Sequence, residues 1–311
     1  MTTLSPPPPP PLPAVAPAPP RPPDAGPPPT RPGFAFAGVA LCVLAALLFG
    51  FAANLTLLGN LQHARDQRTA YDELRRQLAL GTAPVGQRTF DGKRLEPGAP
   101  VALLRIPALD LDEVVEEGTT SGVLMSGPGH RRDTPLPGQA GTSVVMGRQW
   151  GYGGPFNDLH RLVPGTAIEL TTGQGTARYE VTAIRRAGDP LPPVLEQGRG
   201  RLTLITAEGP AYTPSGVLRV DADLVGDVQP NPPRPLAAGW IEGSEQALGR
   251  ENSVWLSVFL WSLGLLAAAL LTTWAHRAWG RWQTWIAGVP VLVALGLAVS
   301  GAAARLLPNL L

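Results

Sequence analysis

The sequence predicts an all-β domain outside the membrane, a sandwich or a barrel, carried on three transmembrane helices. Three observations support this fold class. Between residues 85 and 228, short runs rich in Val, Ile, Leu and Thr alternate or cluster as strands do. Turns rich in Gly and Pro separate these runs. Residues 34–57, 252–275 and 283–304 are apolar stretches without an acidic or basic residue, each long enough to cross a bilayer.

Seven strands are predicted within the β-rich domain at residues 85–228. Seven strands in about 140 residues are typical of a sandwich or a barrel, and the turns between them are long enough to carry a functional site. The predicted strands begin at Val101, Glu113, Thr142, Thr166, Ala177, Leu202 and Val217.

Two segments surround the first apolar span. Residues 1–33 hold 16 of the 36 prolines, so they favour solvated polyproline II and are expected to be disordered. This tail is read either as a docking tract for a proline-recognising domain or as a spacer. Residues 58–84 mix charges with leucines near helical spacing and end in Gly81 and Pro84, which predicts a helical stalk.

The short segment at residues 276–282, between the last two spans, indicates the topology. It carries Arg277 and Arg281, as expected of a cytoplasmic loop, and this places the amino terminus in the cytoplasm and the β-rich domain outside. Arginines that follow the first span oppose this assignment, but long translocated domains obey the charge rule poorly. The sequence therefore predicts a multi-pass plasma-membrane protein, completed by a linker at residues 229–251 and a short tail at 305–311.

Composition excludes several classes of function. With 25 Lys and Arg against 24 Asp and Glu, the chain lacks the positive charge of a nucleic-acid-binding protein. Its single cysteine, Cys42, lies in the first apolar span, which excludes a disulfide framework, a cysteine zinc site and an exposed cysteine nucleophile. The absence of charge within the spans argues against an ion path. We expect neither a metal nor a cofactor, and the lipid bilayer is a partner.

Seven short motifs occur in a specific order within the β-rich domain. They are Leu104-Arg-Ile-Pro107, Val115-Glu-Glu-Gly-Thr119, Gly127-Pro-Gly-His130, Thr134-Pro-Leu-Pro-Gly-Gln139, Tyr152-Gly-Gly-Pro-Phe156, Thr203-Leu-Ile-Thr206 and Leu218-Arg-Val220. This order resembles the sortases, and most of all the class E-like actinobacterial members, over about residues 102–225. The resemblance implies a closed β-barrel of about eight strands on the outer face of the membrane. It also implies a reaction in which a cysteine cleaves a sorting peptide of the LPxTG type and passes it to an amine.

The sequence departs from the family at two of the three positions that carry this chemistry. Where the resemblance implies a nucleophilic cysteine after Thr203-Leu-Ile-Thr206, the chain has Ala207. Where it implies the histidine that protonates the leaving amine, the chain has Arg148. Only Arg219 matches, at the position of the arginine that holds the oxyanion or the substrate. The resemblance therefore supports the fold and argues against cysteine transpeptidation.

The chain holds other histidine and hydroxyl side chains that are candidates for the missing catalytic groups. His130 is predicted to be structural, because a Gly-His at this place resembles a second, non-catalytic histidine of the family. His160 is expected on the surface, and His63 and His276 flank membrane spans. A hydroxyl nucleophile needs an adjacent base. The candidates are Thr206, Thr213 and Ser215, and the nearest acid in the sequence is Glu208.

If the barrel is kept, Arg148 and Arg219 are predicted to lie close to Ala207. Two guanidinium groups there favour an anion such as a peptide carboxylate or an envelope phosphate, partly neutralised by Glu208. The alternative is that Arg148 pairs with Glu208 and fills the site. The aromatic residues Trp150 and Tyr152 are candidates to stack on a ligand at the rim, and packing inside the barrel is the alternative.

These observations lead to one prediction of function and two alternatives. The predicted function is a membrane-anchored, non-catalytic binding or scaffolding module of the cell envelope, with a sorting-signal-like peptide or an anionic envelope group as its partner. The first alternative is an active transpeptidase or hydrolase with a different nucleophile. The second is a membrane-assembly component that works through its helical hairpin and binds a membrane protein.

Overall fold

The computed structural model describes residues 41, 45, 47–234, 236, 237, 239–279 and 281–311. The chain divides into two units, of which the second, Ala46–Leu311, holds every element discussed below. The predicted proline-rich tail lies outside the described residues. So does most of the first predicted span, of which residues 41, 45 and 47–57 are described, as helix.

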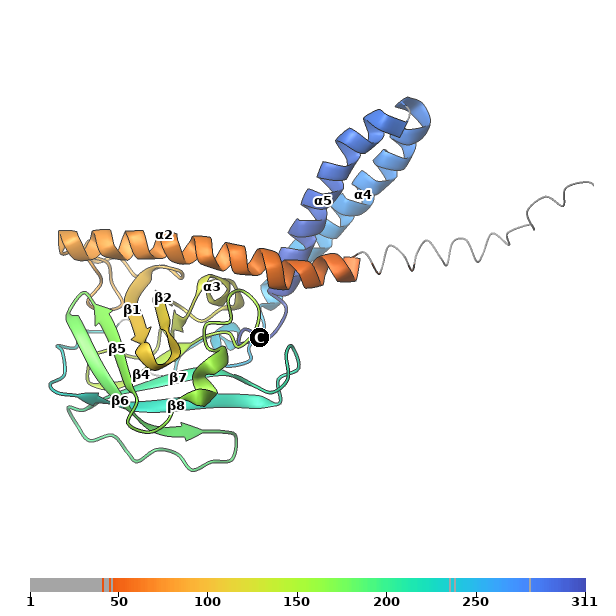
Figure 1. Ribbon diagram of the computed structural model, residues 1–311. Helices are drawn as coiled ribbons and strands as arrows, with labels where there is room; N and C mark the ends of the chain where they lie inside the picture. Colours follow the sequence, from red (N-terminus) through yellow and green to blue (C-terminus); the bar gives the residue numbers. More distant parts are fainter. Residues whose placement is uncertain (1–40, 42–44, 46, 235, 238, 280) are drawn as a thin grey trace, which may run out of the picture. The chain divides into compact units, whose positions relative to one another are not determined.

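Eight strands close into a barrel in the order β1-β2-β3-β4-β7-β8-β6-β5, which confirms the predicted closed barrel (Figure 1). Most neighbouring strands are antiparallel, but β2 with β3 and β4 with β7 are parallel. The strands are β1 (Pro100–Ile106), β2 (Leu111–Glu117), β3 (Gly129–His130), β4 (Gly141–Met146), β5 (Ala167–Thr172), β6 (Gly175–Arg185), β7 (Gly200–Glu208) and β8 (Gly216–Val225).

Alternating side chains build the barrel interior, as the strand pattern predicts. In β6, for example, Ala177, Tyr179 and Val181 are buried while the residues between them are exposed. Short helical turns lie between the strands or beside them: η2 (Pro107–Leu109), α3 (Ser121–Ser126), η3 (Asn157–Arg161) and η4 (Gly243–Glu245).

The predicted stalk is helical but packs against the barrel instead of standing apart from it. A π-helical turn, η1 (Asn54–Leu58), leads into α2 (Gly59–Leu80), which ends at Gly81 in the left-handed conformation. Leu74 is buried in a cluster with Val114 of β2, and the side-chain amide of Gln67 bonds to both backbone groups of Val114. The apolar side chains of this amphipathic helix therefore pack against the surface of the barrel (Figure 1).

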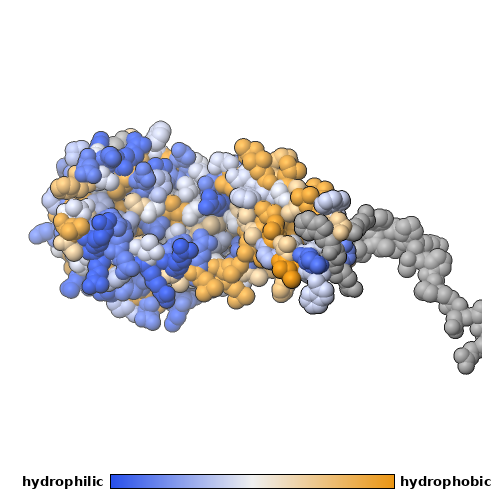
Figure 2. Space-filling model, turned by 90° about the horizontal axis from the view of Figure 1, so that it is seen from above, coloured by the Kyte–Doolittle hydropathy of each residue, from blue (hydrophilic) through white to orange (hydrophobic). Residues whose placement is uncertain are grey.

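Two apolar helices follow the barrel. They are α4 (Trp255–Trp279), preceded by the turn η5 (Asn252–Val254), and α5 (Arg281–Ala304). Among the described residues, two stretches, Asn252–His276 and Trp282–Ala304, are long and apolar enough to cross a membrane. Their side chains are mostly exposed, and Figure 2 shows hydrophobic residues gathered over the helical hairpin and hydrophilic ones over the barrel.

Candidate functional site

The site is built on the face of β7 that points away from the barrel interior. Leu202 and Leu204 point inward, whereas Ile205 and Ala207 belong to a second buried cluster. Directly opposite residues of an antiparallel pair share a face. In the register of β7 and β8, Ile205 lies opposite Arg219 and Ala207 lies opposite Val217. Ala207 and Arg219 are therefore on one face, as the sequence predicts.

Arg148 lies just beyond the end of β4, whose Met146 pairs with Ile205 of β7. Its side chain is fully buried, at 1% exposure. It donates hydrogen bonds through Nη2 to Ser121 Oγ at 2.8 Å, and through Nη1 to the backbone oxygen of Leu311. The guanidinium also stacks on Tyr152, with 5.2 Å between the guanidinium carbon and the ring centroid, a cation–π contact.

No acidic side chain of the described residues pairs with Arg148. Burial lowers the pKa of Arg148 to about 10, which still leaves it charged at neutral pH. A buried charge without an opposite charge costs folding free energy, and an arginine cannot avoid this cost by losing its proton. Arg148 therefore depends on the oxygen acceptors around it.

The segment at residues 305–311 supplies one of these acceptors and fills the space beside Ala207. Asn309, Leu310 and Leu311 are 0, 0 and 3% exposed. The Leu310 side chain belongs to the same buried cluster as Ala207, and the Leu310 carbonyl accepts a 2.9 Å hydrogen bond from the backbone N–H of Gln149. We call Ala207, its apolar cluster, Arg148 and Gln149 the Ala207 site. That a tail of seven residues enters this site was not expected from the sequence.

Comparison with known proteins fits this geometry. Residues 104–225 match the sortase domain family model. Over these residues the barrel resembles the sortase domain. Sortase SrtE1 of Streptomyces coelicolor is 33% identical over 143 residues, which make up 40% of this chain and 41% of that protein. The chain thus spans less than half the length of this curated relative, and the predicted resemblance to class E-like sortases is confirmed.

Solved sortase structures are also similar. Sortase E from Streptomyces avermitilis is 33% identical, with a TM-score of 0.37, and the match covers 42% of this chain and 91% of that one. Sortase E1 from Streptomyces coelicolor, solved with a tripeptide in its active site, is 25% identical with a TM-score of 0.36. That match covers the same two shares, 42% and 91%.

The predicted pair of Arg148 with Glu208 is wrong. In the structure Glu208 Oε1 accepts a hydrogen bond from Arg186 Nε at 2.5 Å. Arg186 lies just after the end of β6, so its approach to the end of β7 depends on the barrel topology. Arg219 is half-buried and makes no side-chain hydrogen bond or ion pair to any residue that the structure describes.

The two predicted stacking residues are not displayed at a rim. Tyr152 is 2% exposed and belongs to a buried cluster with Leu55, Met125 and Ala304. Its φ is +46°, a left-handed conformation that costs a non-glycine residue free energy. Trp150 is half-buried, and its indole nitrogen has no hydrogen-bond partner among the described residues. Of the two predictions for these aromatic residues, packing and not stacking on a ligand at the rim describes Tyr152.

The hydroxyl groups considered as nucleophiles have no base beside them. Thr206 lies between Ile205 and Ala207, so it points to the opposite face, where its hydroxyl is buried without a partner among the described residues. Ser215 Oγ donates to the backbone oxygen of Glu208 at 3.2 Å, and Thr213 Oγ1 to that of Pro210 at 3.5 Å. The Glu208 carboxylate is held by Arg186 and bonds to none of the three.

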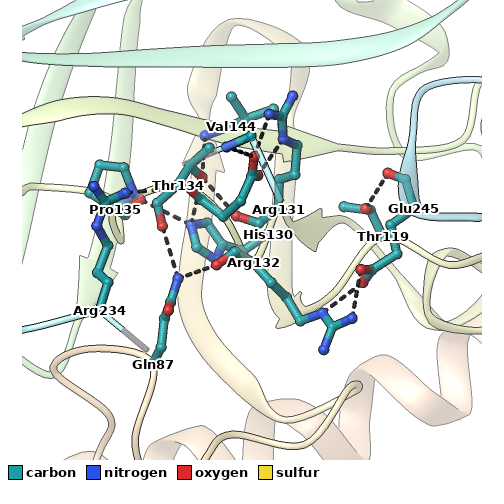
Figure 3. Close-up of polar contacts among 12 residues, drawn as sticks. Gln87, Thr119, His130, Arg131, Arg132, Thr134, Pro135, Val144, Arg234 and Glu245 are labelled. Carbon is teal, nitrogen blue, oxygen red and sulfur yellow. Dashed lines mark hydrogen bonds and ion pairs between the residues drawn. The ribbon is translucent and has the colours of Figure 1, made fainter. Parts of the chain in front are cut away.

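His130 lies in β3, in the polar network that Figure 3 shows, and is fully buried. Its Nδ1 is 2.8 Å from Glu117 Oε2, and its Nε2 is 2.9 Å from the backbone oxygen of Pro135. Beside it, Arg132 donates two hydrogen bonds of 2.7 and 2.6 Å to the Glu245 carboxylate (Figure 3). These partners hold β3 and residues 131–135 in place, which fits the predicted structural role.

The remaining histidines are accounted for as well. His63 of α2 is buried, and its Nε2 lies 3.0 Å from Glu113 Oε1 of β2, so it joins the helix to the barrel. His160 is exposed in η3, as predicted. Within the described ranges, no group of three or more His, Cys, Asp or Glu residues is arranged to hold a metal ion.

Proposed function

We propose that this protein is a membrane-anchored sortase-like binding or scaffolding module of the cell envelope, without cysteine transpeptidase activity. The observation that carries the proposal is the content of the Ala207 site. The position at which the resemblance implies a thiol is a methyl group packed among apolar side chains. The sequence holds no other cysteine than Cys42 to replace it.

Proton transfer is also missing from the Ala207 site. Arg148 stands where the resemblance implies the histidine, and its pKa of about 10 makes it a poor proton donor to a leaving amine near neutral pH. The candidate hydroxyl nucleophiles lack a base, as described above. These features support binding without turnover and give the hydrolase alternative no support.

The Ala207 site has the groups that a peptide needs. The Gln149 N–H donates to a peptide carbonyl, the cluster around Ala207 takes an apolar side chain, and Arg148 donates to a further oxygen. Such backbone donors next to an apolar pocket are a common arrangement for holding an extended segment. A sorting-signal-like peptide is therefore the partner class that we propose.

The proposed setting is the plasma membrane. The hairpin of α4 and α5 is long and apolar enough to anchor the chain, and the arginines in residues 276–282 favour a cytoplasmic loop. This arrangement places the sortase domain outside the membrane and the amino terminus in the cytoplasm. Protease digestion of intact cells should then remove the barrel and spare the loop.

The test uses the full chain in detergent micelles, incubated with LPxTG-like peptides and an amine acceptor and followed by mass spectrometry. We expect neither cleavage nor ligation, together with peptide retained on the immobilised protein. Arg148→Gln should lose this retention, while the exposed Leu191→Gln should keep it. A cleaved or ligated product that disappears in Thr206→Val or Glu208→Gln would replace this proposal with an enzyme of a different nucleophile.

A further inference from the structure

Residues 309–311 are buried more deeply than a loose tail would be. Residues 305–308 connect them to α5, and Figure 1 places the end of the chain beside the barrel near α3. Backbone ends are poorly ordered unless specific contacts hold them. Here the three residues are between 0 and 3% exposed. Their burial implies a dedicated site on the sortase domain.

Each of the three residues has its own set of partners. The Asn309 side-chain amide donates to the backbone oxygens of Thr119 at 2.8 Å and Gln246 at 2.9 Å. The Leu310 side chain fills the apolar cluster that contains Ala207. The Leu311 backbone oxygen accepts from Arg148. This is a residue-by-residue recognition pattern, with a polar, an apolar and an oxygen position in sequence.

The oxygen position favours a negative charge. The guanidinium of Arg148 is buried, Nη2 is bonded to Ser121, Nη1 is bonded to Leu311, and Nε has no partner among the described residues. No acidic side chain of the described residues pairs with this cation, so an anionic acceptor at the third position supplies the opposite charge that it lacks. A planar guanidinium suits a carboxylate in particular.

We propose that the Ala207 site is a recognition site for a peptide that carries Asn, Leu and then a carboxylate, and that residues 309–311 occupy it in cis. This inference rests on the proposed binding function and names its occupant. A tethered segment acts at an effective concentration of roughly millimolar. Free peptides of the same chemistry therefore bind only when the tethered segment leaves.

The first experiment measures whether residues 309–311 are bound. In the full chain with Cys42→Ser, Leu310→Cys reports burial through its rate of reaction with a maleimide. The matched control is Leu191→Cys, since Leu191 is an 84% exposed leucine of the same domain. We expect Leu310→Cys to react at least about tenfold more slowly, because a buried thiol is protected from reagents in solution. Equal rates would overturn the cis assignment.

The second experiment measures competition. The probe is the tripeptide Asn-Leu-Leu with a fluorophore on its amino end and a free carboxylate, and the control probe is its amide. Leu310→Asp should strengthen binding of the free-carboxylate probe by about tenfold, because the tethered competitor is removed. Arg148→Gln should weaken it, and Leu191→Asp should leave it unchanged. This opposite response of two buried positions separates recognition from a general loss of folding.

The outcomes distinguish this inference from the proposed function. Equal binding of the carboxylate and amide probes would overturn the assignment of a carboxylate to the third position. Retention of LPxTG-like peptides by a protein whose Leu310→Cys is unprotected would overturn the cis inference and leave the binding module standing. Cleavage of any of these peptides would overturn the proposed function itself.

Discussion

The network around His130 and the Ala207 site differ in how their buried charged side chains are paired. Near His130, basic and acidic side chains are matched: Arg132 pairs with Glu245, and the His130 ring lies against Glu117. In the Ala207 site, Arg148 is equally buried but has no acidic side chain beside it within the described part of the chain. Its acceptors are Ser121 and the backbone of Leu311. The charged groups near His130 find their partners within that network, whereas Arg148 takes one of its hydrogen-bond acceptors from a segment that is distant in the sequence.

This difference separates structural groups from binding groups. A buried ion pair whose donors and acceptors bond to each other holds structural elements together and leaves no donor or acceptor free for a ligand. A buried cation whose acceptors include the backbone of a distant segment is a candidate to recognise that segment or one like it. The contrast supports the proposed binding role of Arg148 and a structural role of His130.

The largest change in stability is expected from breaking the Arg132–Glu245 ion pair in the network around His130. Arg132→Ala leaves the Glu245 carboxylate, whose side chain is 1% exposed, buried without its partner. Removing one partner of a buried pair costs about 3–5 kcal/mol, and each kcal/mol lowers Tm by about 2–4 °C in a protein of this size. We therefore expect Tm to fall by about 10 °C, measured by tryptophan fluorescence during heating in detergent.

The double variant Arg132→Met with Glu245→Gln is the control for this prediction. Replacing both charges removes the unpaired carboxylate, so most of the lost stability should return. A change of less than about 2 °C in Arg132→Ala would contradict the view that this network is structural.

Local signals in the sequence were sufficient for the strands and the hairpin, whereas the closure of the strands into a barrel was implied by the resemblance to the sortases. Alternation along β6 reports which side chains point inward, and long apolar stretches report α4 and α5. Each of the seven predicted strands coincides with a strand of the barrel, although the one that begins at Thr166 starts one residue before β5. The missing one, β3, has two residues, which is too short for a periodic pattern.

The residues that fill the Ala207 site could not be predicted, because they are brought together by contacts between segments that are distant in the sequence. Nothing in the run at residues 305–311 distinguishes a loose tail from one buried beside Ala207, because Arg148 and Leu311 are 163 positions apart in the sequence and meet only through the fold. The Glu208 pairing failed for the same reason, since Arg186 approaches through the barrel topology. The prediction for Ala207 and Arg219 succeeded because side chains alternate between the two faces of a strand, and this alternation along β7 and β8 places both residues on one face.

A smaller effect, with a pH signature, is expected at Glu116, the acidic counterpart of Arg148. Glu116 is 5% exposed and makes no side-chain hydrogen bond or ion pair within the described residues. Burial raises the pKa of Glu116 to about 8, with a further contribution from the Asp66 carboxylate. Unlike an arginine, this carboxyl group avoids the cost of a buried charge by keeping its proton.

The sign of the pH effect follows from proton binding. Between the ordinary pKa of 4.5 and about 8, folded Glu116 keeps a proton that the unfolded chain has released, so stability falls as pH rises. Glu116→Gln removes this dependence and should raise Tm by a few degrees at pH 8, at about 2–4 °C per kcal/mol, and little at pH 5. Asp66→Asn should reproduce only a minor part. Parallel Tm curves for the wild type and Glu116→Gln would show that Glu116 is ionised in the fold.

The smallest effect is expected from Ala207→Cys, which asks whether the Ala207 site lacks only a nucleophile. A thiol is a small apolar group, so Tm should change by no more than about 3 °C. Turnover of LPxTG-like peptides should remain undetectable by mass spectrometry, because the thiol is covered by Leu310 and its cluster and Arg148 does not protonate a leaving amine. The comparison variant is Ala207→Cys with Arg148→His and Leu310→Asp, which supplies the thiol and the imidazole and removes the covering segment. Product from this triple variant alone would attribute the loss of catalysis to all three features, whereas product from Ala207→Cys alone would show that a single substitution separates this binding site from an enzyme.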